Sequence, residues 1–459
     1  MSAVIAEPTT LMPVNPLVDH FRCPRLPSFA TGSNPGGSTG FFQFGDGAVC
    51  YGQVAGAVSV PASGQMFDAS KHVASGDGTI FLPFDVRQSI DNLRYERYVN
   101  GSAGHRWMEQ SWVKDIYYRL RPMMPVSLRK HLQKIYLRGW ESIPFPNWPV
   151  DRSVDILLEK LLIVAMKQMQ VDRVPFIWFW PDGHKACAIM THDVETASGR
   201  DFCERLMDID DEFGIKASFQ IVPEKRYSVT ESFLEMIRRR EYEINVQGLD
   251  HDGNLFAHRE EFLKRARQIN KYANQWGAVG FRSPILYRNI DWFQDLDFQY
   301  DMSIPNVARV EAQRGGCCTV MPYVLPGGIT ELPVTVSEDY TLFHILNDYS
   351  ITLWKRQAEI IVSGYGLVNF IIHPDYVMPS RAQDVYKTLL EHLRQLRSEQ
   401  NLWITLPGEV DRWWRQRNEM KLVAGKQNWV IEGPGSDRAK VAWARVDGDR
   451  LVYQTNCSA

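Results

Sequence analysis

The chain has 459 residues, of which 44% are hydrophobic and 23% charged, and its formal net charge is −3. This length exceeds one average domain, and the composition is that of a globular protein with a sizeable core. The near-neutral charge gives no reason to expect nucleic acid or an anionic membrane as a partner, and no run approaches the roughly eighteen apolar residues of a membrane span.

The N-terminus and the cysteines bear on the cellular compartment. Residues 1–17 lack a basic start followed by an apolar core, so they do not resemble a secretory signal. The seven cysteines are odd in number and none stands in a Cys-x-x-Cys pair, which argues against a disulfide framework or a zinc knuckle. We therefore expect a reduced, cytoplasmic protein.

The first 180 residues suggest a region that precedes the main domain. Residues 1–45 are rich in Pro, Gly, Ser and Thr, so we expect a loosely ordered N-terminus. Within residues 46–180, short apolar pieces separated by glycine predict a small β element. A basic, aromatic helical stretch follows it. This stretch could contact a glycan or an acidic partner, but it is more typical of a helical collar packed on the main domain.

Strands and helices alternate over residues 181–407. Such alternation predicts parallel strands joined by crossover helices, and about eight strands of this kind predict a closed or nearly closed (β/α) barrel. The predicted strands cover 186–192, 216–222, 242–248, 278–283, 297–303, 329–335, 367–373 and 402–406. Residues 408–459 begin with a helical stretch and end in short β pieces, which predicts a small C-terminal β appendage.

The first predicted barrel strand ends in two carboxylates. An apolar run leads into Thr191-His192-Asp193-Val194-Glu195. Asp193 and Glu195 are two residues apart, so on an extended chain both carboxylates point the same way. Two anions on one face repel each other unless a cation, a proton or a basic side chain lies between them. The alternative is a solvated strand end that caps the next helix.

Polar groups also follow the other predicted strands, and they decide between these alternatives. A histidine such as His373, taken alone, would more often be a buried hydrogen-bonded residue. Carboxylates, histidines and an arginine gathered at strand ends are instead the inventory of a hydrolytic site. The groups concerned are the stretch Gln247 to Asp252, Arg282 with Pro284, Asp301, and His373 with Asp375.

The order of these motifs resembles that of the polysaccharide deacetylase family, the carbohydrate esterases that include chitooligosaccharide and peptidoglycan deacetylases. The resemblance covers residues 185–406 and implies an α/β fold, a distorted (β/α) barrel. Around it the sequence adds a β/helical N-terminal extension and the small C-terminal β appendage. The four similar motifs are Thr191 to Glu195, the His-x-x-x-His position at Gln247 to His251, the Arg-x-Pro motif at Arg282 to Pro284, and Ile371 to Pro374.

The resemblance also implies a reaction, the metal-assisted removal of an N-acetyl or O-acetyl group. Asp193 would be the general base, held by Arg282, and His373 would be the general acid. A divalent cation, usually zinc, would lower the pKa of the attacking water and polarise the carbonyl group. The metal-ligand positions of the family are occupied by Glu195, Gln247 and His251.

Two of these positions depart from the family pattern, which has aspartate in place of Glu195 and histidine in place of Gln247. Glutamate is an acceptable oxygen ligand for zinc, whereas a neutral amide is a poor substitute for imidazole. Asp252, His192 or His258 could complete the ligand set, or a harder metal could be used. Alternatively the metal is lost, and the activity with it.

We expect an acetylated sugar or glycan precursor as the substrate, and the chain could form a homo-oligomer. Two alternatives stay open: hydrolysis of another C–N bond in a small non-sugar substrate, and a catalytically degenerate barrel that binds a glycan or a partner protein. The residues expected to contact substrate are His192, Asp252, Asp301, Pro284 and Asp375.

Overall fold

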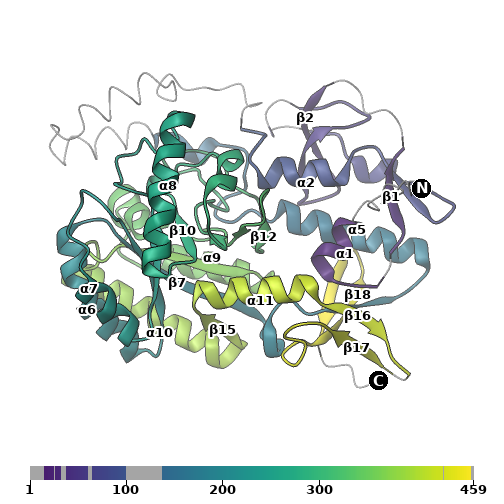
Figure 1. Cartoon of the computed structure of the whole chain (residues 1–459). Coiled ribbons are helices and arrows are strands. Elements are labelled where there is room, and N and C mark those ends of the chain that lie inside the picture. The colour runs from purple at the N-terminus through teal and green to yellow at the C-terminus, as the bar shows by residue number, and fades with distance from the viewer. Residues whose placement is uncertain are drawn as a thin grey trace, which may run out of the picture.

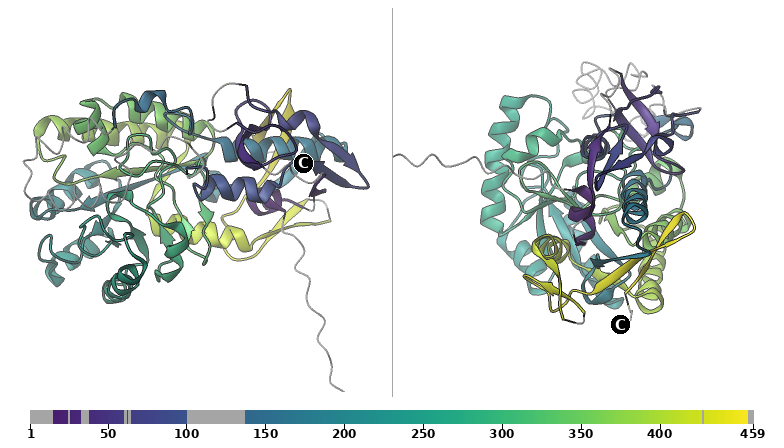
Figure 2. Two further views of the ribbon diagram at one scale, coloured as in Figure 1. Left: turned by 90° about the horizontal axis from the view of Figure 1, so that it is seen from above. Right: turned by 90° about the vertical axis from the view of Figure 1, so that its right-hand side faces the viewer.

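The computed structural model of the chain shows a barrel on one side, with the N-terminal and C-terminal parts of the chain packed together on the other (Figures 1 and 2). No helix in the described part of the chain is long and apolar enough to cross a membrane. Most of the basic, aromatic stretch in the predicted collar falls at 101–136, outside the described residues. The structure describes residues 15–24, 26–32, 38–59, 62, 65–99, 137–426 and 428–455.

The barrel is a curled sheet of nine strands in the order β12-β13-β11-β10-β9-β8-β7-β14, with β15 also paired to β7. All these pairings are parallel except that of β12 with β13. Each predicted barrel strand overlaps one of them, so the distorted (β/α) barrel is confirmed. The bounds are β7 (Ala186–Val194), β8 (Ala217–Ile221), β9 (Glu243–Gln247), β10 (Gly280–Arg282), β11 (Tyr300–Asp301), β12 (Tyr323–Val324), β13 (Thr330–Glu331), β14 (Leu367–Ile372) and β15 (Leu402–Thr405).

The crossover helices cover the outer face of the sheet (Figure 1). All nine residues of β7 are buried, as expected for a parallel strand covered on both faces. Its even-numbered residues, such as Ala188 and Met190, share a core cluster with the helices, including Leu206 and Leu389. The helices are α6 (Ala197–Glu212), α7 (Glu231–Arg239), α8 (Arg259–Trp276), α9 (Thr352–Ser363) and α10 (Ser380–Gln400).

Side chains close the barrel between the segment after β13 and the edge of β14. The Thr335 hydroxyl donates a hydrogen bond to the carbonyl oxygen of Leu367 (2.7 Å) and accepts one from the backbone N–H of Asn369 (2.9 Å). The Asn369 side chain in turn donates to the carbonyl oxygen of Leu332 (3.0 Å). These bonds satisfy backbone groups of β14 that would otherwise be buried without partners.

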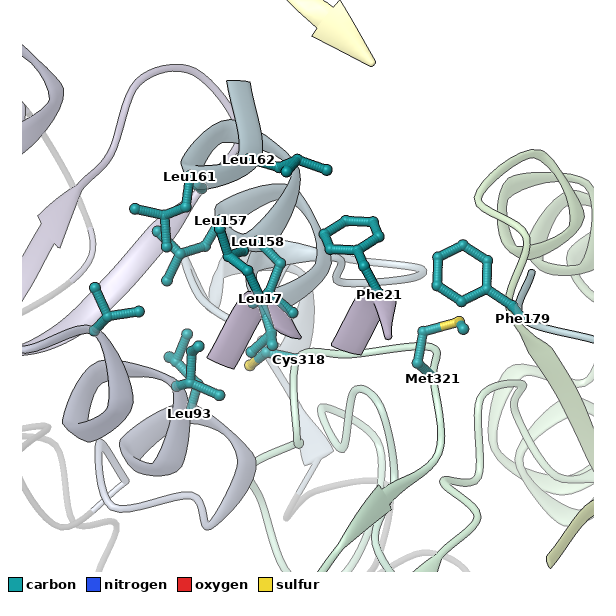
Figure 3. Packing of buried hydrophobic residues seen from close by; sticks show 14 of the residues in the cluster. Leu17, Phe21, Leu93, Leu157, Leu158, Leu161, Leu162, Phe179, Cys318 and Met321 are labelled. Carbon is teal, nitrogen blue, oxygen red and sulfur yellow. The ribbon is translucent and has the colours of Figure 1, made fainter. Parts of the chain in front are cut away.

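Part of the segment predicted to be loosely ordered, residues 1–45, forms a helix and strands. They belong to an N-terminal part made of α1 (Pro16–Phe21), β1 (Ser28–Thr31), β2 (Thr39–Gln43), β3 (Val49–Gln53), β4 (Ala74–Gly76), β5 (Thr79–Leu82), α2 (Val86–Arg94), α5 (Ser153–Met169) and β6 (Arg173–Ile177). Leucines of α5 pack against Leu17 and Phe21 of α1 and lie near Cys318 and Met321 of the barrel region (Figure 3). One core therefore joins this part to the barrel.

The C-terminal segment is tied to the N-terminal part. β18 pairs antiparallel with β6, so one sheet holds residues from both sides of the barrel sequence. The buried guanidinium of Arg417 donates to the carbonyl oxygens of Trp178 (3.0 Å) and His20 (2.9 Å). The elements of this segment are α11 (Pro407–Glu419), β16 (Lys421–Ala424), β17 (Trp429–Glu432), β18 (Val441–Asp447) and β19 (Arg450–Gln454).

The closure of the barrel by Thr335 can be tested with Thr335→Val, which keeps the shape of the side chain and removes its hydroxyl. We expect a loss of about 1–3 kcal/mol in the free energy of unfolding, because buried backbone groups of β14 lose their partners. Denaturant unfolding monitored by circular dichroism measures the loss. The control Thr388→Val removes an exposed hydroxyl on α10, and an equal loss in both variants would contradict the role of Thr335.

Candidate active site

The end of β7 and the turn that follows it place two carboxylates inside the barrel. Side chains alternate along a strand, so Thr191 and Asp193 face the interior while His192 faces the helices. Asp193 is only 3% exposed. Glu195 follows in the turn before α6, whose first turn is capped by the Thr196 hydroxyl accepting from the backbone N–H of Gly199 (3.0 Å).

The side chain of Gln247 bridges these two carboxylates. Gln247 is the last residue of β9 and is 1% exposed. Its Nε2 group donates to Asp193 Oδ2 (3.1 Å) and to Glu195 Oε1 (3.0 Å). One amide group therefore supplies donors to both anions and offsets part of their repulsion. The Gln247 Oε1 atom is buried and has no hydrogen-bond partner among the described residues.

Two imidazoles approach Glu195 from other strand ends. The Nε2 atom of His251 lies 2.6 Å from Glu195 Oε1, and the Nε2 atom of His373 lies 3.5 Å from the same oxygen. Burial by itself would raise the pKa of Glu195. The charges and hydrogen bonds of His251 and His373 outweigh it and hold this pKa well below its usual range. Glu195 is thus an anion at neutral pH.

Asp339 fixes the orientation and the charge of His373. The Nδ1–H of His373 donates to Asp339 Oδ1 (2.7 Å), and the backbone N–H of His373 donates to Asp339 Oδ2 (2.7 Å). Burial lowers the pKa of His373, but the Asp339 carboxylate, followed by Glu195, raises it well above the ordinary value. His373 therefore carries a proton on Nε2 at neutral pH and can give it to a leaving group.

Arg282, at the end of β10, faces Asp193 from inside the barrel. One of its guanidinium nitrogens, Nη1, lies 3.5 Å from Asp193 Oδ1, and Nη2 donates to the Thr191 hydroxyl (3.1 Å). That hydroxyl donates to the carbonyl oxygen of Phe370 on β14 (2.6 Å). Burial raises the pKa of Asp193, while the charges of Arg282 and His373 work against this rise.

A glycine and a proline shape the turn that carries Gln247 and His251. Gly248 has a φ of +56°, and a Cβ at this position would lie 2.4 Å from Cγ of Pro284. Only glycine fits here, because any side chain would clash with the proline ring and strain the backbone. Pro284 was predicted to contact substrate. The structure instead packs it against this turn.

Two other predicted substrate contacts have partners within the protein. His192 is fully buried on the helix side of β7, with Nε2 2.9 Å from Asp210 Oδ2 of α6. The alternation of the strand directs it away from Asp193. Asp252 accepts two hydrogen bonds from Arg265 on α8 (2.8 and 2.9 Å), so its carboxylate is already occupied. Neither residue supplies a missing metal ligand.

The two remaining predicted substrate contacts differ from each other. Asp301 is buried and accepts hydrogen bonds from the backbone N–H and the hydroxyl of Ser303 (2.9 and 2.6 Å), so it supports the barrel interior. Asp375 lies near the candidate site, because the charges of His373 and Glu195 act on its pKa, which burial raises. Its Oδ1 atom is buried and has no hydrogen-bond partner in the described residues. Asp375 stays a predicted substrate contact.

Three acidic residues near His373 were not predicted. Besides Asp339 they are Glu311 and Glu338, which line one small cavity of about 10 Å³, enough for a single water. Burial raises the pKa of Glu311 to about 7 and that of Glu338 well above its usual range. Glu311 comes from a segment without regular structure. In the sequence, the one signal for these residues was the acidic pair 338–339 just beyond the sixth predicted strand.

The residues can be tested against the divalent ion that the motif resemblance implies. Three side chains each bring one ligand atom to within 4.8 Å of the other two, close enough to hold an ion. They are Asp193, Glu195 and His373. They do not fit the expected zinc site. Gln247 directs an N–H₂ group at the carboxylates.

Comparisons with known proteins concern the barrel. No protein-family model matches the chain, and no curated protein matches it either. A structure from Mycobacterium smegmatis described as a polysaccharide deacetylase has 20% sequence identity and a TM-score of 0.44, over 55% of this chain and 98% of that one. The chain resembles the polysaccharide deacetylases, as its motifs predict.

Two further similar structures are proteins with other activities. An allantoinase shares 10% identity with a TM-score of 0.38, over 51% of this chain and 92% of its own. A family 4 acetyl xylan esterase from Clostridium thermocellum, in complex with a cobalt ion, shares 15% identity with a TM-score of 0.30, over 50% of this chain and 91% of its own.

The effect of Asp339 on His373 can be tested with Asp339→Asn. The amide keeps the shape of the side chain but removes the negative charge, so we expect the pKa of the His373 imidazole to fall. NMR titration of the histidine ring signals measures it. Asp252→Asn, whose carboxylate contacts Arg265, is the control and should leave the titration of His373 unchanged. An unaltered His373 titration in Asp339→Asn would contradict the assignment.

Proposed function

We propose that the chain hydrolyses an acetyl amide or ester, with Asp193 as general base and His373 as general acid. The observation that carries the proposal is that these two side chains come within 4.8 Å of each other from different strand ends. Each has a positioning partner of opposite charge, Arg282 for Asp193 and Asp339 for His373. A base and an acid that are each held by a separate partner suit the two proton transfers of acyl hydrolysis.

In the proposed reaction Asp193 takes a proton from a water molecule, whose oxygen attacks the acetyl carbonyl carbon. The C–N or C–O bond then breaks, and its electron pair goes to the leaving nitrogen or oxygen. His373 gives that atom the proton on Nε2, so the products are acetate and an amine or alcohol. Asp193 then returns its proton to solvent and His373 regains one, which completes the cycle.

The nature of the substrate is supported by the motifs of the sequence. Their resemblance to polysaccharide deacetylases favours an acetylated sugar or a glycan precursor, and we propose a cytoplasmic one. Zinc, which the same resemblance implies, has no step in this mechanism because Gln247 does not fit a zinc ligand. The departure at Gln247 also favours a second candidate function, a barrel that binds a glycan without hydrolysing it.

Asp193→Asn separates these two functions. The amide cannot accept a proton from water, so we expect acetate release from N-acetylated chitooligosaccharides to fall by at least about 100-fold. Circular dichroism should show an unchanged fold. Asp252→Asn is the matched control and should keep full activity. Hydrolysis by Asp193→Asn at the parent rate would refute the catalytic assignment, and a parent chain that binds the oligosaccharide without releasing acetate would support the binding function.

The pH dependence of kcat/KM gives a second test. Asp193 acts as an anion and its pKa is raised. Activity should therefore fall as the pH decreases, and the pH at the midpoint of this fall should lie above the ordinary aspartate pKa. His373 acts as a cation and its pKa is raised, so activity should fall with increasing pH at a value above the ordinary histidine range. Asp339→Asn should move only the alkaline limb, and toward lower pH. A profile that keeps its alkaline limb in this variant would argue against His373 as the acid.

A further inference from the structure

We infer that the amide of Gln247 takes the place of a resident divalent ion: it holds Asp193 and Glu195 together, and the protein does not retain zinc between them. This inference deepens the proposed function, because it concerns the same site. It does not depend on hydrolysis being observed, since metal retention is measured without substrate.

The direction of the amide is the first support. The two N–H groups on Nε2 of Gln247 match two acceptors, Asp193 Oδ2 at 3.1 Å and Glu195 Oε1 at 3.0 Å. In the opposite orientation the amide oxygen would stand about 3 Å from two carboxylate oxygens, and three acceptors would repel one another unless a cation joined them. The orientation in the structure satisfies both carboxylates without one.

The number of conventional ligands is the second support. A catalytic zinc ion takes three protein ligands, and at the family's ligand positions only Glu195 and His251 remain. The other groups whose ligand atoms reach this space, Asp193 and His373, have partners of their own. Asp193 accepts from Gln247 and faces Arg282, and His373 donates to Asp339. Two protein ligands are too few to keep a zinc ion bound in competition with water.

The surroundings of His251 are the third support. A histidine that binds a metal almost always donates its other ring N–H to a carboxylate, a carbonyl oxygen or a water, which fixes the ring. Nδ1 of His251 is buried and has no hydrogen-bond partner among the described residues. His373, in contrast, has this support from Asp339 at Nδ1. The histidine in a metal-ligand position therefore lacks the second contact that metal binding calls for.

Gln247 thus acts as a positioning residue. By holding Oδ2 of Asp193, it leaves Oδ1 facing Arg282 and free of other hydrogen bonds in the described structure. Glu195, held by the same amide and by His251, supplies negative charge beside His373.

The inference is tested by metal content. The full chain is dialysed against zinc chloride, then against metal-free buffer, and analysed by plasma mass spectrometry; titration calorimetry with zinc and cobalt ions gives the affinity. We expect the parent chain to retain far less than one ion per chain. Gln247→His should retain about one and bind at least about 100-fold more tightly, since it restores an imidazole ligand.

Two controls locate the ion. Gln395→His adds a histidine on an exposed face of α10 and should not raise metal retention. Gln247→His combined with His251→Ala should lose the ion again. A parent chain that keeps one zinc ion per chain would overturn the inference, whether or not Gln247→His folds. Acetate release by the parent should be unaffected by EDTA, whereas the absence of any acetate release would bear on the proposed hydrolysis alone.

Discussion

The structure of the site depends on one electrostatic constraint, the closeness of two carboxylates: that of Asp193, buried at the end of β7, and that of Glu195, half-buried just after it. Two such anions facing the same space repel strongly in a medium of low polarity. They can be kept there only by donors and cations brought from elsewhere in the chain. Gln247, His251, Arg282 and His373 fill this role, and they come from three other strand ends.

The curl of the sheet makes this gathering possible. β8 and β9 follow β7 on one side and β14 pairs on the other, so the ends of β9, β10 and β14 surround the end of β7. Pro284 packed on Gly248 sets the turn toward His251, and Thr335 holds β14 against the segment that continues to Asp339. Packing features distant from the reaction thereby fix the distances between the charges.

The sequence predicts the strands of the barrel well, because buried parallel strands appear as short apolar runs between amphipathic helices. It also identifies Asp193, Arg282 and His373, which directly end or follow such runs. The sequence did not indicate that His192 faces the helices, because its proximity to Asp193 hid the alternation of the strand. It did not indicate the contact of Asp252 either, because the partner, Arg265, lies thirteen residues further along the chain on a helix. Asp339 and Glu311 follow no regular pattern, so only the folded chain reveals their position beside His373.

Gln247 shows that one constraint has two physical solutions. A histidine at this position offers an electron pair, and together with the carboxylates and His251 it would form a cluster of electron-pair donors that is stable only around a cation. A glutamine offers hydrogen-bond donors, so the same carboxylates are satisfied by the protein itself. The residue at the end of β9 therefore decides which charge the site can accept. With glutamine there, an incoming divalent ion would have to displace two hydrogen bonds before it gained a ligand.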